Sequence, residues 1–231
     1  MQTDVDPQVR RTAQFNQDAA ALIVEAGLEA IAKNGLFRLG LAGGNTPRAV
    51  YEQLAAQPDA LPWDKVQITF GDERCVPPED SASNYRMAWE SLLSRVPIPE
   101  ANVFRVRGEI SPEEASLEYE AKLAAVASQF GEACYAHDLL LLGLGEDGHT
   151  ASLFPDSPAL AETVRTVVPN TGPKPPPQRI TFTFPLINAA RRVLFLLKDP
   201  AKEPILQAAL KGEFPSGKVR PINGSVIWLV G

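Results

Sequence analysis

The residues with the clearest chemical potential lie in a glycine-rich segment, residues 139–155, that begins with four leucines. It contains His149, one of two histidines in the chain, and Asp147 two residues before it. Free imidazole titrates near about pH 6.5, so histidine is the usual general base at neutral pH. A neighbouring carboxylate can orient the ring or stabilise its charge. The segment therefore predicts a general base, His149, presented just beyond a buried strand.

Other chemistry in this segment fits the pattern less well. The run Glu146-Asp147-Gly148 lacks the alternating acidic ligands of an EF-hand. One histidine among scattered carboxylates is a poor zinc site, so we expect no metal ion. Ser152 lacks a GxSxG turn and a second base, which disfavours a serine nucleophile. The other histidine, His137, precedes the apolar strand, and we expect it at the surface.

Two further segments are suited to binding an anion. In Gly43-Gly44-Asn45-Thr46-Pro47, the glycines allow close approach to a ligand, and the next helix directs its N–H groups at it. The segment is neither a Walker loop nor a GxGxxG motif. In Gly71-Asp72-Glu73-Arg74, the guanidinium of Arg74 could pair with phosphate oxygens. Taken alone, a tight turn before a capped helix and a surface ion pair explain these segments equally well.

More cations follow later in the chain. Lys174 and Arg179 flank a run of prolines, and Lys198 and Lys202 surround the last crossover. We expect Lys202 in the first turn of a helix beginning at Ala201, where its ammonium could reach an anion at the sheet edge. Each of these cations, considered singly, is best explained as a solvated surface group.

Apolar runs and helical periodicity alternate along the chain and indicate the elements that position these residues. They predict about eight strands, at 37–41, 66–70, 103–106, 139–142, 164–168, 180–184, 193–197 and 226–230. Helices are predicted at 12–33, from a cap at Thr46, at 84–95, from a capping box at 111–114 to near 131, at 185–191 and at 201–211. This order predicts an α/β fold with a largely parallel sheet and helices on both faces. Residues 169–177 are expected to be a stiff loop.

Composition limits the remaining possibilities. The chain has 231 residues, 45% of them apolar, and we expect residues 1–231 to form one domain. A net charge of −6 disfavours a nucleic-acid partner. The longest apolar runs are far shorter than a membrane span, and residues 1–11 lack the apolar core of a secretory signal. Cys75 and Cys134 are far apart, which is typical of a reducing compartment, so we expect a cytoplasmic protein.

Together these segments resemble the 6-phosphogluconolactonases. The matching stretches, in the family's order, are LAGGNTP (41–47), GDERCVP (71–77), SASNYRMA (81–88), LLGLGEDGHTASLFP (141–155), GPKPPPQRIT (172–181) and LKDPAKEPILQAAL (197–210). The fourth and fifth are the specific ones, whereas the glycine pair and Asp-Glu also occur in a wider group. That group includes the glucosamine-6-phosphate deaminase/isomerases and implies a modified Rossmann-like fold. The chain lacks a histidine that the family often has between the second and third stretches, and an aspartate after the last strand.

The resemblance implies hydrolysis of 6-phospho-D-glucono-1,5-lactone to 6-phospho-D-gluconate, in the oxidative pentose phosphate pathway, without a cofactor. It implies that His149 deprotonates water, that Asp72 and the loop glycines position the lactone, and that cations hold its phosphate. The expected catalytic residues are His149, Asp72 and Asp147. The expected substrate-binding residues are Gly43, Gly44, Thr46, Arg74, Gly148, Arg179 and Lys202.

Two alternatives belong to other classes of function. A deaminase/isomerase would also use Asp72 and His149, but that group normally has IAFNEP after Asp-Gly-His and a tyrosine in place of Arg74. A phosphosugar-sensing module of a transcription regulator would carry a helix-turn-helix domain first, whereas only residues 1–11 precede the first predicted helix here. The sequence leaves open whether the protein is a monomer or a homodimer.

Overall fold

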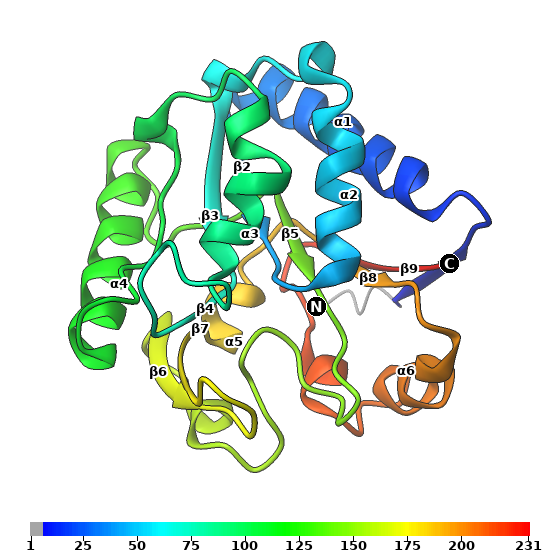
Figure 1. The fold of residues 1–231 in the computed structure, drawn as a ribbon, viewed down its shortest axis with the longest axis vertical. Helices are drawn as coiled ribbons and strands as arrows, with labels where there is room; N and C mark the ends of the chain where they lie inside the picture. The colour runs from blue at the N-terminus through cyan, green and yellow to red at the C-terminus, as the bar shows by residue number, and fades with distance from the viewer. Residues whose placement is uncertain (1–6) are drawn as a thin grey trace.

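The computed structural model describes residues 7–231, and its centre is a six-stranded parallel sheet (Figure 1). The strand order is β1-β9-β8-β5-β2-β3. The strands are β1 (Gln8–Arg11), β2 (Phe37–Leu41), β3 (Val66–Phe70), β5 (Leu139–Leu142), β8 (Arg192–Leu197) and β9 (Ser225–Val230). The strand order reverses at β2, which has β3 on one side and β5 on the other, and open α/β sheets bind ligands at such a point. The predicted fold class is confirmed, while predictions for residues 1–6 lie outside the described residues.

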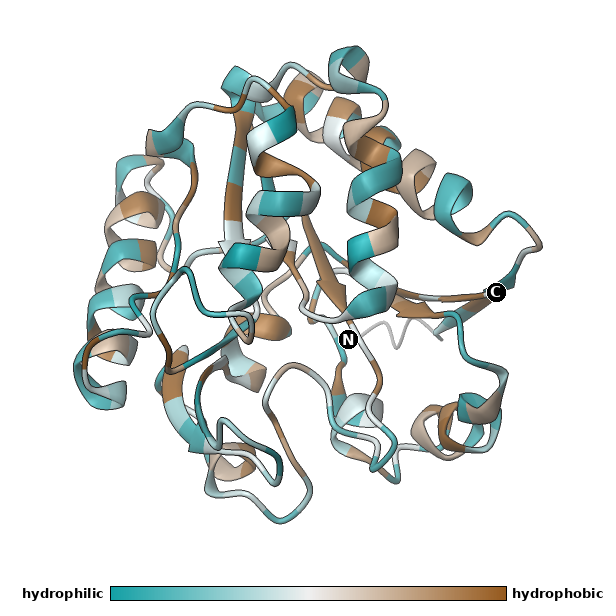
Figure 2. Ribbon diagram, in the orientation of Figure 1, coloured by the Kyte–Doolittle hydropathy of each residue, from teal (hydrophilic) through white to brown (hydrophobic). Residues whose placement is uncertain are grey.

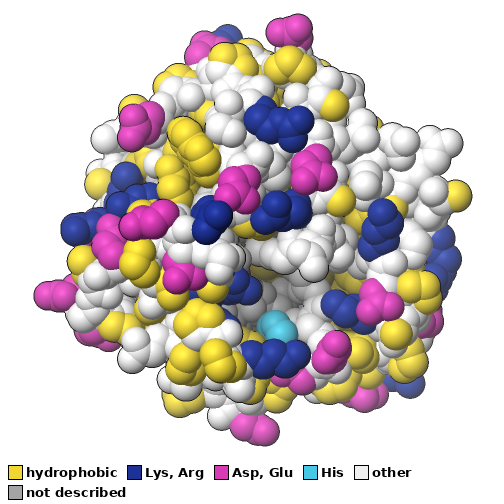
Figure 3. Space-filling view, viewed as in Figure 1, with side chains coloured by type: hydrophobic (Ala, Val, Ile, Leu, Met, Phe, Trp, Pro, Cys, Tyr) yellow, Lys and Arg dark blue, Asp and Glu magenta, His cyan; other side chains and the backbone are white. Residues whose placement is uncertain are grey.

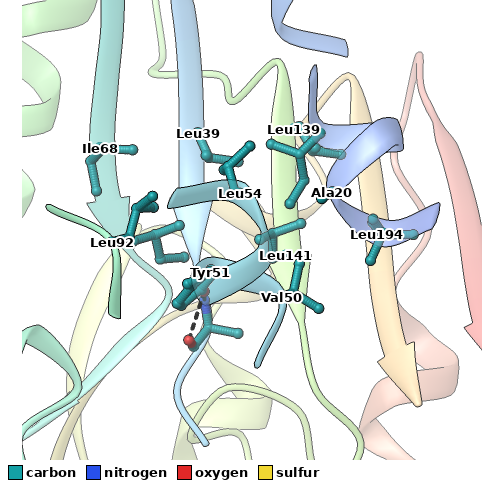
Figure 4. Close-up of a cluster of buried hydrophobic side chains, with 14 of the residues drawn as sticks. Ala20, Leu39, Val50, Tyr51, Leu54, Ile68, Leu92, Leu139, Leu141 and Leu194 are labelled. Atoms are coloured by element: carbon teal, nitrogen blue, oxygen red, sulfur yellow. Dashed lines mark hydrogen bonds between the residues drawn. The ribbon is translucent and has the colours of Figure 1, made fainter. Parts of the chain in front are cut away.

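Two hydrophobic cores lie on opposite faces of this sheet. Helices α1 (Phe15–Asn34), α2 (Asn45–Ala55) and α3 (Asn84–Ser91) cover one face, and α4 (Pro112–Gln129), α5 (Phe184–Ile187) and α6 (Glu203–Leu210) contribute to the other core. Because strand side chains alternate, Leu139 and Leu141 enter the first core while Leu140 and Leu142 enter the second. Apolar residues accordingly line the strands (Figure 2), and Figure 4 shows part of the first core.

A second, three-stranded antiparallel sheet was not predicted. It has the order β4-β7-β6, formed by β4 (Asp72–Arg74), β7 (Gln178–Phe182) and β6 (Val167–Thr171). Strands β6 and β7 form a hairpin, so Pro169, expected in a loop, lies within β6 opposite Ile180. The apolar runs of this hairpin carry no information about which sheet they join. The prediction of a single sheet is therefore wrong for these strands.

Several local predictions can be compared directly. The start of the helix at Ser111 is confirmed, because the Ser111 hydroxyl caps it by accepting from the Glu114 amide at 3.3 Å, and this hydroxyl also donates to the Glu114 carboxylate at 2.6 Å. The cap at Thr46 is wrong: α2 begins at Asn45, and Gly44 precedes it with φ 104°. Residues 103–106 form only an isolated bridge to Ile68. Strand β1 was not predicted. None of the helices within residues 7–231 has the length and apolarity needed to cross a bilayer.

His137 precedes β5 as predicted, but it is fully buried, so the expected surface position is wrong. Its ring packs against Tyr135 and Phe182, with centroid distances of 5.0 and 5.3 Å. Its Nε2 lies 2.8 Å from the Thr69 hydroxyl. Aromatic side chains contributed by the small sheet and the preceding loop thus enclose the ring. Burial, with a smaller contribution from Arg38, lowers the pKa of His137 to about 3.

Candidate active site

A cavity of about 550 Å³ opens at the carboxyl ends of β2, β5 and β8 and beside β4. Figure 3 shows the hollow on this face, with a histidine and several Lys and Arg side chains around it. The cavity brings together nine of the ten predicted site residues, which come from five separate segments of the chain. They are Gly43, Gly44, Thr46, Asp72, Arg74, Asp147, His149, Arg179 and Lys202.

His149 and Asp147 form the pair predicted from their spacing. The His149 Nδ1 lies 2.5 Å from an Asp147 carboxylate oxygen, which also accepts from the His149 amide at 3.1 Å. Partial burial tends to raise the pKa of Asp147, but the hydrogen bonds from His149 outweigh it, and the pKa is lowered. The carboxylate therefore stays charged and favours the tautomer with its proton on Nδ1. Nε2 is then left as a proton acceptor.

The loop around His149 is shaped to hold this ring. The Phe154 ring lies 4.7 Å from the imidazole, centroid to centroid. A Cβ on Gly145 would lie 2.0 Å from the imidazole Nδ1, so only glycine fits there. Gly148 is the one predicted site residue that does not line the cavity. It has φ 76°, its amide donates to the Gly145 carbonyl, and a Cβ there would overlap the Phe214 ring.

The glycine pair after β2 is fixed from within the first core. The Tyr51 hydroxyl accepts from the Ala42 amide at 2.9 Å and donates to the Ala42 carbonyl at 2.8 Å, as Figure 4 shows. Tyr51 belongs to α2 and is fully buried, so the loop and the helix that follows it are held together. The first turn of α2, with Gly43 and Gly44, forms one wall of the cavity.

Asp72 is held by two side chains that the sequence analysis did not assign to the site. The Ser152 hydroxyl donates to one carboxylate oxygen of Asp72 at 2.7 Å, and the Asn84 amide donates to the other at 3.2 Å. Both residues line the cavity, although they are almost fully buried. Ser152 donates its proton to a carboxylate, and that it is no nucleophile stays a prediction. The available sequence signal for Asn84 was the SN run after the Asp72 segment, and for Ser152 it was the ASLF run after His149.

Arg74 and Arg179 are opposite one another in the β4–β7 register, and both line the cavity. Arg74 donates to the Ala82 carbonyl, and Arg179 donates to the Lys174 carbonyl at 3.2 Å. The second guanidinium nitrogen of Arg179 is buried with no hydrogen-bond partner among residues 7–231. Burial, followed by the charge of Arg74, lowers the pKa of Arg179. Two adjacent guanidinium groups of this kind favour an anion between them.

Lys202 reaches the same cavity from the other side. It ends a short 3₁₀ helix (Pro200–Lys202) directly before α6, rather than lying in the first turn of an α-helix, and its ammonium donates to the Leu144 carbonyl at 2.5 Å. Within the described part of the chain, Arg74, Arg179 and Lys202 form no ion pair with a carboxylate. Their charge is available to a bound anion.

Metal ligands are not gathered anywhere in the described residues. Across residues 7–231, no group of three or more His, Cys, Asp or Glu side chains is arranged to hold a metal ion. Whether activity is metal-independent remains a prediction.

Comparison with known proteins identifies the family. Residues 10–228 match the family described as glucosamine-6-phosphate isomerases/6-phosphogluconolactonase. The chain belongs to this family. This family member is 43% identical over 208 residues to a 6-phosphogluconolactonase of Synechocystis, covering 87% of this chain and 85% of the relative. It is 40% identical over 202 residues to a 6-phosphogluconolactonase of Homo sapiens, covering 84% of this chain and 78% of the relative.

Solved structures show the same fold. This family member superimposes on the crystal structure of a 6-phosphogluconolactonase of Thermotoga maritima with a TM-score of 0.87 and 29% identity, covering 97% of this chain and all of the other. A 6-phosphogluconolactonase of Trypanosoma brucei gives a TM-score of 0.82 and 28% identity, covering 97% and 95% of the two chains. The fold that the sequence resemblance implied is confirmed.

Proposed function

We propose that this protein hydrolyses 6-phospho-D-glucono-1,5-lactone to 6-phospho-D-gluconate. The observation that carries the proposal is the His149–Asp147 pair beside a cavity where three of the lining cations have no carboxylate partner among residues 7–231. A base next to an anion-binding surface suits an ester bearing a phosphate. Relatives named 6-phosphogluconolactonase, at up to 43% identity over most of the chain, support the same reaction.

The residues suggest the following steps. Nε2 of His149 accepts a proton from water as the water oxygen bonds to the lactone carbonyl carbon. The carbonyl oxygen becomes an oxyanion, which the N–H groups at the start of α2, beyond Gly43 and Gly44, could stabilise. When the ring C–O bond breaks, the leaving oxygen takes the proton back from His149. The products are a free hydroxyl group and a carboxylic acid, which ionises to the carboxylate and releases a proton to the solvent. Asp147 stabilises the transient imidazolium.

The remaining site residues bind substrate in this proposal. Arg74, Arg179 and Lys202 hold the phosphate, because guanidinium and ammonium groups form charge-assisted hydrogen bonds with its oxygens. Asp72 accepts hydrogen bonds from hydroxyl groups of the lactone, and Thr46 contributes its own hydroxyl. Gly148 contributes through the shape of the His149 loop.

A direct assay tests the reaction. Freshly prepared lactone should release acid much faster with the protein than without it, after subtraction of spontaneous hydrolysis. Treatment with a chelator should leave the rate unchanged. Glucosamine 6-phosphate is the matched control, and it should release no ammonia. Ammonia release without lactone hydrolysis would assign the chain to the isomerase branch of its family, and inactivity on both substrates would favour a sensing module.

We further propose a single domain, a cytoplasmic location and no nucleic-acid partner. The net charge of −6 supports the last point, and the widely spaced cysteines support a reducing compartment. Some relatives, from rice, are named chloroplastic, so the compartment varies within the family.

A further inference from the structure

Glu73 lies between two site residues but outside the cavity. Successive side chains of a strand point to opposite faces, so Asp72 and Arg74 line the cavity while Glu73 points behind β4. Glu73 is only 2% exposed. A buried carboxylate is costly unless its oxygens accept hydrogen bonds, so its partners indicate what it does.

Four donors converge on this carboxylate. One oxygen accepts from the amides of Arg74 and Asn84, both at 2.7 Å. The other accepts from the Tyr85 amide at 2.8 Å and the Ser83 hydroxyl at 3.1 Å. Asn84 and Tyr85 begin α3, and the first N–H groups of a helix have no partner within it. Glu73 therefore ties β4 to the start of α3 across the loop 75–82.

The first residue of α3 is also the one that reaches the site. The Asn84 side-chain amide donates to the Asp72 carbonyl at 2.9 Å and to its carboxylate at 3.2 Å. The side-chain oxygen of Asn84, Oδ1, lies against Gly43, where an added Cβ would be only 2.1 Å from it. Asn84 thus connects the loop after β2 to Asp72, and its own backbone is fixed by Glu73.

We propose that Glu73 is a positioning residue for the hydrolysis: it fixes Asn84, which holds Asp72 and packs against the glycine loop in the geometry that binds the lactone. This inference rests on the proposed function. A comparison site elsewhere, less buried and ion-paired with Arg165, makes it testable. Glu120 also accepts from two consecutive backbone amides, those of Thr166 and Val167, but none of these residues lines the cavity.

The first experiment compares Glu73→Gln with Glu120→Gln. A glutamine side chain presents an NH₂ group in place of one accepting oxygen, so at least one donor loses its partner. We expect kcat/KM on the phosphorylated lactone to fall about 10–100-fold for Glu73→Gln, the scale of a misplaced site group. For Glu120→Gln we expect a change below about threefold, with a similar loss of thermal stability. Equal kinetic losses in the two variants would overturn the proposal.

A double-mutant cycle tests whether Glu73 acts through Asn84. Asn84→Ala removes the contact to Asp72 directly. If Glu73 works through that contact, the double variant Glu73→Gln/Asn84→Ala should be no worse than Asn84→Ala by more than about threefold. Combining Glu120→Gln with Asn84→Ala should multiply the separate effects. If the kinetic losses of Glu73→Gln and Asn84→Ala also multiply in the double variant, Glu73 has only a structural role.

A crystal structure of Glu73→Gln separates this inference from the proposed function. If the unsubstituted protein does not hydrolyse the lactone, the proposed function fails, while the positioning is still judged from the coordinates. The variant should lose the contact between the Asn84 amide and Asp72, and an unchanged contact would overturn the inference. If Glu73→Gln does not fold, Glu73→Asp, a carboxylate of shorter reach, takes its place in the same comparison.

Discussion

The two ends of strand β5 carry the two histidines of the chain in opposite surroundings. His137, before the strand, is enclosed by aromatic rings, and burial lowers its pKa to about 3. His149, after the strand, has a side chain 32% exposed beside a cavity, with a carboxylate at its Nδ1. The same side chain is a packing group at one end and a candidate base at the other. What faces the ring therefore decides its chemistry.

The arginines near the two ends of β5 also differ, in whether they are paired with a carboxylate. At the amino end, Arg38 pairs with Glu132, and Arg191 pairs with Asp138 at 2.6 Å. At the carboxyl end, Arg74 has no carboxylate partner among the described residues. Paired charges hold the fold together, whereas charges without a partner are available to a ligand.

Substituting His149 should give the largest effect. His149→Asn keeps a polar side chain but removes the nitrogen that accepts the proton. We expect kcat to fall about 10²–10⁴-fold with a much smaller change in KM, the usual loss on removing a general base. Initial rates with background subtraction would measure this. A variant that keeps most of its kcat would place the base elsewhere in the cavity.

Substituting Arg74, which has no carboxylate partner among the described residues, should give the next largest effect on activity. Arg74→Ala should reduce kcat/KM on the phosphorylated lactone by about 2–4 kcal/mol in transition-state stabilisation, because one partner of a charge-assisted pair is lost. The loss should nearly disappear on glucono-1,5-lactone, which lacks the phosphate. Arg191→Ala is the control from the other end and should lower stability with little effect on kcat/KM. Equal losses for Arg74→Ala on both lactones would instead link Arg74 to the chemistry or the fold.

Removing the charge behind the base should have a moderate effect. Asp147→Asn keeps the shape but no longer favours the tautomer with Nε2 free. Since Asp147 is partly exposed, we expect a loss of about 10–100-fold in kcat, less than for a fully buried partner of this kind. Because the pKa of Asp147 is lowered, the unsubstituted enzyme should not lose this carboxylate between pH 8 and 5. A variant with unchanged kcat would show that the pair is not used in catalysis.

Substituting His137, at the amino end of β5, should affect stability rather than activity, and the effect should depend on pH. His137 has a folded pKa of about 3, below the unfolded value of about 6.5, so the fold favours the neutral ring. This contribution is complete above pH 6.5 and is lost as the pH falls toward 3, at up to about 1.4 kcal/mol per pH unit. His137→Gln should cost about 1–3 kcal/mol at pH 7, and the deficit should shrink at pH 5. Urea unfolding at both values measures it, and a constant deficit would mean that His137 does not titrate on unfolding.

Sequence reasoning succeeded where one segment carried both the element and the chemistry. The four leucines of β5 run directly into the His149 loop, so the position of His149 beside the cavity could be predicted, while its role as the base stays a prediction. It failed where the outcome depended on distant segments. The burial of His137 is produced by Phe182 and Thr69, which lie far from it in sequence. The second sheet was missed for the same reason, because a hairpin of apolar strands can join either sheet.

The site itself shows the same limit at finer scale. Nine of the ten expected residues line the cavity, but Asn84 and Ser152 were not assigned to it. Their role comes from hydrogen bonds to Asp72, and no local pattern specifies such bonds. Gly148 was expected, from the family resemblance, to help position the lactone, whereas it lies outside the cavity lining and its Cα faces the Phe214 ring.

The pairing of β1 with β9 has a consequence for how this molecule assembles. Gln8 lies beside Ile227, and the β1–β9 pairs are the strand partners most distant in sequence within the described chain. Such a contact closes a very long loop, whose entropic cost must be met by structure already in place. Among the described strands, β1 is synthesised before all the others, whereas β9, its neighbour in the sheet, is synthesised after all the others. We therefore expect this edge of the sheet to be completed late in folding, after β2, β3, β5 and β8 have formed.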